Sequence, residues 1–355
     1  MSTLFTPLAL RAVTLPNRVA LAPMCQYTAG PDGLPTGWHL VHLGTRAVGG
    51  AGLVLTEATA VLPDGRISPQ DTGLWSGAHV DAWRPVTAFV AAQGAVPAVQ
   101  LAHAGFKAST YRPWEPRRGG VPDTEGGWTP VGPGNEPFVP DYRRPTALDE
   151  SGIAAVVEAF AAAAGRAVDA GFQAVEIHAA HGYLLHEFLS PLTNHRTDGW
   201  GGDRAGRMRL TLAVARAVRA AVGEDLPVLA RISATDWVDG GWSVDDSVDL
   251  AGELAAASVD LVDCSSGGAS PDATVPVGPG YQVPLAARIR REAGVATGAV
   301  GLIVEPEQAE QIVATGEADL VLLGRELLRD PYWPHRAAAK LGTTPTWPSQ
   351  YLRAT

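Results

Sequence analysis

Three residues with side chains suited to catalysis lie close together in the middle of the chain. They are His178, His181 and Tyr183, at the start of the stretch HAAHGYLLHEFLSPLTNHRTDGWGGD. Imidazoles donate hydrogen bonds and bind metal ions near neutral pH, and a phenol can transfer a proton. Considered alone, the two histidines are as compatible with a structural role as with a functional one. A metal site would need further ligands, and the sequence offers few carboxylates in positions that could complete a usual set.

This stretch follows one of eight short apolar runs that predict β-strands. The runs are nearly continuous rather than alternating, which is typical of parallel strands covered on both faces. The predicted strands span residues 19–24, 52–58, 95–103, 172–179, 227–233, 259–265, 295–300 and 319–324. Amphipathic, Ala-rich segments between them predict helices over residues 81–93, 149–170, 203–222, 244–257 and 305–315.

Strands that alternate with helices predict an α/β protein, and eight of them predict a TIM (β/α)8 barrel. A doubly wound sheet is the rival architecture, but the first strand runs into Ala22-Pro23-Met24-Cys25-Gln26-Tyr27 without a G-x-G-x-x-G turn. We expect a single domain over residues 1–355, because no linker divides the chain. Residues 104–147 form an excursion after the third strand, which is either a functional lid or a solvated insertion.

Composition narrows the possible partners and compartment. The 355 residues carry a formal net charge of −10, which argues against nucleic acid or an anionic membrane as a partner. The apolar run 153–170 is interrupted by Glu158, Arg166 and Asp169, so it does not predict a membrane span. Two cysteines, Cys25 and Cys264, exclude a disulfide framework. With no convincing signal peptide, these features predict a cytoplasmic protein.

Polar residues and glycines gather at the carboxyl ends of the predicted strands. In a TIM barrel these ends open on one face, where the chemistry occurs. The residues at these ends are Cys25, Tyr27, Glu57, Ala58, Gln100, His103, His178, His181, Tyr183, Arg231, Cys264, Ser265, Ser266, Gly298, Gly301, Gly324 and Arg325. Each of them is a weak signal alone, but together they predict an active site at this face.

Glycines after the last two strands indicate a phosphate site. Gly298 and Gly301 follow the seventh strand, and Gly324 with Arg325 follows the eighth. Backbone N–H groups at such loops bind phosphate in this fold, and an arginine matches the charge. The glycines could also serve only tight turns. A phosphate site beneath a neutral, amide-rich cleft favours a nucleotide-like cofactor.

Several motifs together resemble the Old Yellow Enzyme family, and more narrowly its bacterial, thermophilic-like branch with a cysteine beside the flavin. They are APMCQY at 22–27, the long stretch from His178, ARIS at 230–233, DCSSG at 263–267 and GRELLRDP at 324–331. The similarity covers nearly the whole chain. It implies a TIM barrel with bound FMN that uses NADPH or NADH to reduce activated C=C bonds of unsaturated carbonyl or nitro compounds.

The resemblance also implies roles for individual residues. His178 and His181 would donate hydrogen bonds to the substrate oxygen, Tyr183 would deliver a proton, and Cys25 would tune the flavin. Tyr27, Lys107 and Arg353 match positions around the substrate, and no firm role follows for Lys107. The implied FMN-binding residues are Ala22, Pro23, Met24, Cys25, Ala58, Gln100, Arg231, Gly298, Gly301, Gly324 and Arg325.

The resemblance further implies a homodimer or homotetramer in which the tail, residues 341–355, inserts Arg353 into a neighbouring subunit's pocket; a frayed tail is the alternative. The ending Ala354-Thr355 is less bulky than the family pattern. Two other functions stay open: a metal-dependent barrel hydrolase that uses His178 and His181, and a non-catalytic flavin-binding barrel. No site for the 2′-phosphate of NADPH is identifiable.

Overall fold

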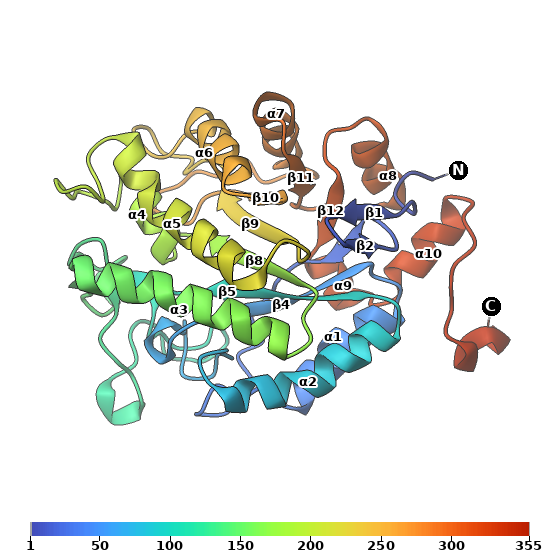
Figure 1. Ribbon diagram of the computed structural model, residues 1–355, viewed down its shortest axis with the longest axis horizontal. Helices are drawn as coiled ribbons and strands as arrows, with labels where there is room; N and C mark the ends of the chain where they lie inside the picture. Colours follow the sequence, from blue (N-terminus) through green and yellow to red (C-terminus); the bar gives the residue numbers. More distant parts are fainter. Residues whose placement is uncertain (1, 355) are drawn as a thin grey trace.

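The computed structural model describes residues 2–354, and its centre is a closed barrel of eight parallel strands (Figure 1). Neighbours in the barrel follow chain order, and β12 pairs with β3 to close the ring. The strands are β3 (Val19–Leu21), β4 (Leu53–Ala60), β5 (Val96–Ala102), β8 (Ala174–Ala179), β9 (Val228–Ser233), β10 (Leu261–Ser265), β11 (Ala296–Ala299) and β12 (Leu320–Leu323). The predicted TIM barrel is confirmed, and each predicted strand is present with small shifts of its ends.

Helices connect successive strands around the outside of the barrel (Figure 1). They are α1 (Gly37–Val48), α2 (Gly77–Ala92), α3 (Glu150–Asp169), α4 (Leu184–Leu189), α5 (Arg204–Val222), α6 (Val244–Ala256), α7 (Val283–Ala293), α8 (Pro306–Ala314), α9 (Arg325–Arg329) and α10 (Trp333–Lys340). The five predicted helices correspond to α2, α3, α5, α6 and α8. The others were not predicted.

An N-terminal hairpin closes the amino-terminal end of the barrel. Its strands β1 (Leu8–Leu10) and β2 (Val13–Leu15) pair antiparallel. Leu10 and Leu15 pack in one apolar cluster with residues from every barrel strand, among them Leu53 and Leu229. This end of the barrel is therefore filled with apolar side chains, and polar chemistry is left to the opposite, carboxyl end.

The excursion between β5 and α3 is partly ordered rather than a plain loop. It holds the 3₁₀ turns η2 (Gly105–Lys107) and η3 (Asp123–Glu125) and a short parallel pair, β6 (Val131–Gly132) with β7 (Thr146–Ala147). Two further 3₁₀ turns are η1 (Pro63–Gly65) after β4 and η4 (Ser349–Ala354) in the tail. Trp128 of the excursion packs with Tyr27 and Tyr183, so the excursion covers the carboxyl end of the barrel.

Among residues 2–354, α3 is the one helix that is long and apolar enough by composition to cross a membrane. It is instead a crossover on the outside of the barrel, and Ile153, Phe160 and Ala164 on one of its faces are buried in the main core. A core helix of this kind passes the same compositional test. Ala170 and Gly171 end the helix, as the sequence predicted, with Gly171 at φ 87°.

Candidate active site

His178, His181 and Tyr183 come together at the carboxyl end of β8. The ring of His178 lies 5.1 Å from that of His181 and 5.0 Å from that of Tyr183, with each pair of rings nearly perpendicular. His178 is 3 % exposed, and its Nδ1 has no hydrogen-bond partner among the described residues. The prediction that these three residues share one site therefore agrees with their placement.

A strained turn after β8 sets the position of the His181 ring. His181 has φ 61°, a left-handed conformation that costs free energy in a residue with a side chain. Its N–H donates to Ser233 Oγ at 2.9 Å, and its carbonyl accepts from Lys107 Nζ at 2.9 Å. The next N–H, of Gly182, donates to Nδ1 of the fully buried His186 at 2.9 Å. These contacts hold a conformation that the turn would not keep alone.

Lys107 joins two loops of this face rather than reaching an open pocket. Its ammonium donates to the carbonyls of His181, at 2.9 Å, and Gly268, at 2.6 Å, and lies 3.9 Å from the centre of the Phe138 ring. Burial lowers the pKa of Lys107 to about 8. The structure thus gives Lys107 backbone partners, whereas the sequence offered only an unspecified place near the substrate.

Burial keeps both histidines uncharged at neutral pH. The pKa of His178 and that of His181 lie well below the usual value, chiefly because burial disfavours the imidazolium, with Arg231 adding repulsion. Each neutral ring retains one N–H. His181 Nε2 lies 2.7 Å from Ser265 Oγ, a hydroxyl that can pair with either tautomer of the ring.

Cys25, Tyr27 and Tyr183 belong to one small cluster that also contains Ala58 and Trp128. Burial raises the pKa of the Cys25 thiol and those of the two phenols well above their usual values. The thiol and both hydroxyls are therefore protonated at neutral pH. Cys25 and Tyr27, which follow β3, therefore lie near Tyr183, which follows β8.

A buried cation lies beside His178, on the neighbouring strand of the barrel. Arg231 is 6 % exposed and pairs with His178 in the register of β8 and β9. Its Nε is 3.0 Å from Asp263 Oδ2. Glu176, which accepts from Gln100 Nε2 at 2.8 Å, has its pKa raised to about 8 by burial and by repulsion from Asp263. Arg231 is thus a fixed positive charge with acidic neighbours on two strands.

A cavity of about 170 Å³ connects Arg231 with the glycines after β11 and β12. Gly301, Gly324 and Arg325 line it, as predicted, and so does Arg329, which the sequence reading missed. Arg329 stands four residues after Arg325 on α9, a spacing that places both on one helical face and could have revealed it. Arg325 forms no hydrogen bond or ion pair that involves its side chain within residues 2–354.

Gly298 and the motif around Met24 have different surroundings. Gly298 lies within β11, where an added Cβ would meet Leu322 Cδ1 at 2.6 Å, and it does not line the cavity. An added Cβ on Gly324 would lie 3.5 Å from Met24 Sδ and 4.0 Å from Ala22 Cβ, so the ends of β3 and β12 are adjacent. Pro23 is half-buried in the same segment. The structure therefore places Ala22 and Met24 beside Gly324 but leaves Gly298 outside the 170 Å³ cavity.

The structure does not place the C-terminal tail at this centre, and it offers no ligand set for the metal-dependent alternative within residues 2–354. Arg353 is exposed in the tail, which lies beside α10 at the end of the barrel opposite α4 (Figure 1). Among residues 2–354 no group of three or more His, Cys, Asp or Glu side chains is arranged to hold a metal ion. The metal-dependent alternative therefore has no ligand set in the described part of the chain.

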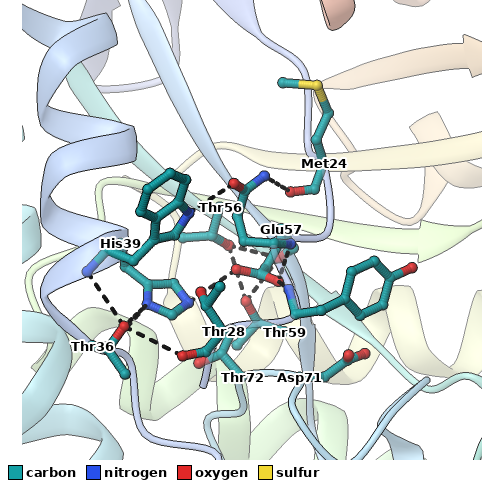
Figure 2. Close-up of polar contacts among 12 residues, drawn as sticks. Met24, Thr28, Thr36, His39, Thr56, Glu57, Thr59, Asp71 and Thr72 are labelled. Carbon is teal, nitrogen blue, oxygen red and sulfur yellow. Dashed lines mark hydrogen bonds and ion pairs between the residues drawn. The ribbon is translucent and has the colours of Figure 1, made fainter. Parts of the chain in front are cut away.

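Glu57 is the strand-end residue whose role the sequence did not indicate. It lies beneath the first-strand motif, where its carboxylate accepts from Gln26 N at 2.7 Å and contacts His39 of α1 (Figure 2). Nothing in the spacing of His39 and Glu57 predicts this contact, because it depends on how α1 packs beside β4.

Comparison with known proteins agrees with this arrangement. Residues 3–344 match the model of the NADH:flavin oxidoreductase / NADH oxidase family. An NADPH dehydrogenase of Halalkalibacterium halodurans is 45 % identical over 99 % of this chain and 98 % of its own. Morphinone reductase is similar in structure, with a TM-score of 0.80, 29 % identity and coverage of 98 % and 92 % of the two chains.

An Old Yellow Enzyme homologue from Zymomonas mobilis has a TM-score of 0.79 at 27 % identity, covering 97 % of this chain and 94 % of its own. The family model matches most of the chain, and the relatives have a similar length. Together they confirm the family that the sequence motifs resembled. The chain belongs to the NADH:flavin oxidoreductase / NADH oxidase family, that of Old Yellow Enzyme.

Proposed function

We propose that this protein is an FMN-dependent ene-reductase, which uses NADPH or NADH to reduce activated C=C bonds of α,β-unsaturated carbonyl or nitro compounds. The observation that carries the proposal is the meeting of two neutral imidazoles and a protonated phenol beside a buried arginine, at the carboxyl end of a barrel. Membership of a flavin oxidoreductase family and 45 % identity to an NADPH dehydrogenase support it.

The residues around the 170 Å³ cavity fit the phosphate end of FMN. Gly301 and Gly324 leave room for close approach of backbone, and Arg325 has a guanidinium without a protein partner in the described chain. Arg231 supplies a second, buried positive charge. Ala22, Pro23, Met24, Ala58 and Gln100 would complete the site. Bound FMN would supply two-electron redox chemistry, the acceptance of hydride from NAD(P)H and its delivery to the alkene.

His178 and His181 are suited to bind the oxygen of the activating group. When the β-carbon of an unsaturated carbonyl accepts hydride, negative charge moves onto this oxygen. Donors that are already in place stabilise that charge more than they stabilise the ground state. Because the pKa of each ring is lowered by burial, each acts as a neutral donor with one N–H.

Tyr183 is suited to give a proton to the α-carbon. Its pKa is raised by burial, so Oη keeps its proton at every pH where the enzyme would work. The ring stands perpendicular to that of His178, which places it beside the same substrate. Cys25, protonated in the same cluster, would tune the cofactor and contact the substrate without a covalent step, and Tyr27 would line the substrate pocket.

The assembly and compartment are part of the proposal. The exposed Arg353 and the place of the C-terminal tail beside α10 are compatible with a homo-oligomer in which the tail serves a neighbouring subunit. The two free cysteines are compatible with the cytoplasm. The substrate would be a small activated alkene.

One spectrum tests the function. Purified protein should be yellow, should bleach under anaerobic NADPH, and should recover its colour when 2-cyclohexenone is added. A colourless protein that does not take up FMN would contradict the proposal. A yellow protein that NADPH bleaches but that no enone or maleimide reoxidises would indicate the non-catalytic alternative.

A further inference from the structure

A buried carboxylate, Glu57, holds the backbone that carries Cys25 and Tyr27. Glu57 is 4 % exposed, and its Oε2 accepts hydrogen bonds from Gln26 N at 2.7 Å and Tyr27 N at 3.4 Å (Figure 2). Tyr27 has φ 52°, so the backbone at this point is strained. The carboxylate therefore satisfies the two N–H groups that define the turn between the thiol and the phenol.

An irregularity in β4 places Glu57 in this position. The register of β4 with β5 shifts between Leu55 and Ala58, which is where a bulge redirects a side chain. The carbonyl of Glu57 accepts from both Thr56 Oγ1, at 3.0 Å, and Thr59 Oγ1, at 2.8 Å. The two threonines thereby fix the backbone of Glu57 independently of its carboxylate.

His39 connects this carboxylate to the first turn of α1. Its Nδ1 accepts from Thr36 N at 2.8 Å, as part of the capping box that begins the helix. In a neutral ring the proton must then be on Nε2. Nε2 lies 3.0 Å from Glu57 Oε1 and is otherwise enclosed, since His39 is 2 % exposed. The cap of α1 thus selects the tautomer that faces Glu57.

A second contact ties α1 to the same backbone segment. Trp38 Nε1 donates to Gln26 Oε1 at 2.9 Å, and Gln26 Nε2 donates to the carbonyl of Met24 at 2.7 Å. Two successive residues of α1 are therefore linked to the segment 24–27. Trp38 contacts Gln26 directly, and His39 contacts Glu57, which in turn binds the segment (Figure 2). Because Cys25 and Tyr27 share a cluster with Tyr183, the position of this segment sets part of the active site.

We propose that Glu57, oriented by His39, is a positioning residue that fixes the Cys25 thiol and the Tyr27 phenol at the active site. The effect of Glu57 on catalysis rests on the proposed function. Its role in positioning Cys25 and Tyr27 rests only on contacts within this chain. Burial raises the pKa of Cys25, and the charges of Asp71 and Glu57 raise it further. Removing the Glu57 charge should therefore lower the pKa of Cys25, and the reactivity of the thiol measures that change.

The first test replaces the charge. Glu57→Gln removes the negative charge and replaces one carboxylate oxygen with an NH2 group, so either Gln26 N or His39 Nε2 then faces a donor instead of an acceptor. We expect Cys25 in the holoenzyme to be alkylated by iodoacetamide at least about threefold faster than in wild type at the same pH, which corresponds to a fall of about half a unit in the thiol pKa. Mass spectrometry identifies the labelled residue, and Cys25→Ala gives the background from the fully buried Cys264.

The second test separates positioning from helix capping. His39→Asn keeps an acceptor near Nδ1 for Thr36 N but removes the Nε2–H that faces Glu57, whereas His39→Gln keeps an N–H near Nε2 and removes the cap acceptor. We expect His39→Asn to raise the alkylation rate of Cys25 about threefold, and His39→Gln to leave that rate within about twofold of wild type while lowering the melting temperature.

Wild-type labelling rates in both Glu57→Gln and His39→Asn would overturn the proposal, and so would faster labelling in His39→Gln than in His39→Asn. These rates do not depend on turnover. A protein with the expected labelling pattern but no alkene reduction would contradict the proposed function and leave the positioning role intact. A protein that reduces alkenes but shows unchanged labelling would contradict the positioning role and leave the proposed function intact.

Discussion

Tyr183 is the residue whose replacement should separate the two halves of the catalytic cycle. Tyr183→Phe removes the proton donor but keeps the ring that packs against His178. We expect the holoenzyme to oxidise NADPH at close to the wild-type rate, while reduction of 2-cyclohexenone slows by about 10²-fold, the usual contribution of a general acid. Stopped-flow absorbance measures the two half-reactions separately. Equal losses in both would contradict the role of Tyr183 as proton donor.

Asp71 should give the protein a measurable pH dependence of stability. Burial raises its pKa from 3.8 to about 7. As the pH rises from 4 to 7, the unfolded chain releases this proton while the folded chain retains it, so the free energy of unfolding falls, by at most about 4 kcal/mol. Asp71→Asn can still accept from Ile67 N and donate to Ser68 Oγ, its present partners, but has no such proton.

We therefore expect the melting temperature of Asp71→Asn, relative to wild type, to rise steadily between pH 4 and pH 7. Calorimetry at several pH values measures this difference, and comparing the two proteins removes the contributions of the other buried acids. A difference that stays constant, or that falls with pH, would show that Asp71 is ionised in the folded protein.

The sequence predicted the residues of the site better than it predicted their partners. His178, Tyr183 and Arg231 could be found because each stands at the carboxyl end of an apolar run, and the barrel brings these ends together. The contact of His39 with Glu57, or of Lys107 with the carbonyl of His181, could not be found in this way. Such contacts depend on side-chain directions across loops, for which a single sequence contains no periodic signal.

Within the β8–α4 connection, Gly182 is the point where two loops approach most closely. An added Cβ would lie 2.1 Å from the carbonyl oxygen of Gly268, at φ 70°. Gly94 is a matched control, since it has φ 82° but nothing within 4 Å of an added Cβ. We expect Gly94→Ala to cost about 1 kcal/mol through backbone strain alone, and Gly182→Ala to cost at least about 3 kcal/mol because backbone must move.

Gly182→Ala should also slow alkene reduction by at least about tenfold, because His181 is the preceding residue and a shift of about 1 Å at a binding group is costly. Thermal melts and half-reaction kinetics on both variants measure the two effects. If Gly94→Ala and Gly182→Ala lost the same stability and activity, the close approach of the two loops would have no bearing on the site.

Two of the helices that the sequence did not predict, α1 and α7, have few large apolar residues on their buried faces. In α1 the buried face includes His39, His42 and Arg46, while Trp38 and Val41 are 51 % and 60 % exposed. In α7 only Val283, Ala286 and Ile289 are buried, among many charged residues. Burial of polar groups is tolerated in α1 because they have partners, as where Arg46 donates to the carbonyls of Leu327 and His42.

At the scale of the whole molecule, the two ends of the barrel have different tasks. The amino-terminal end is closed by the hairpin β1–β2 and packed with apolar side chains, and the carboxyl end holds the polar site. The C-terminal tail lies with α10, away from α4 and the loops of the site (Figure 1). The tail that carries Arg353 therefore lies at the end of the barrel away from its own chain's site.

A mixing experiment tests this arrangement. In a symmetric dimer that exchanges tails, Arg353→Ala removes a substrate contact from the partner's pocket, and Tyr183→Phe disables the pocket of its own chain. A hybrid of the two variants then has one complete site, formed by Tyr183 of the first chain and Arg353 of the second. Random mixing makes half of the dimers hybrids, so we expect about a quarter of wild-type alkene reduction to return after the subunits exchange.

The control is the same mixture without subunit exchange, which should show only the sum of the two residual activities. If Arg353 acted within its own chain, the hybrid would contain no complete site, and exchange would restore nothing. If the tail had no part in the reaction, Arg353→Ala alone would already reduce 2-cyclohexenone at the wild-type rate. Because the tail and the site lie at opposite ends of one barrel, recovery on mixing would require that the neighbouring chain approach with its amino-terminal end beside this chain's carboxyl end.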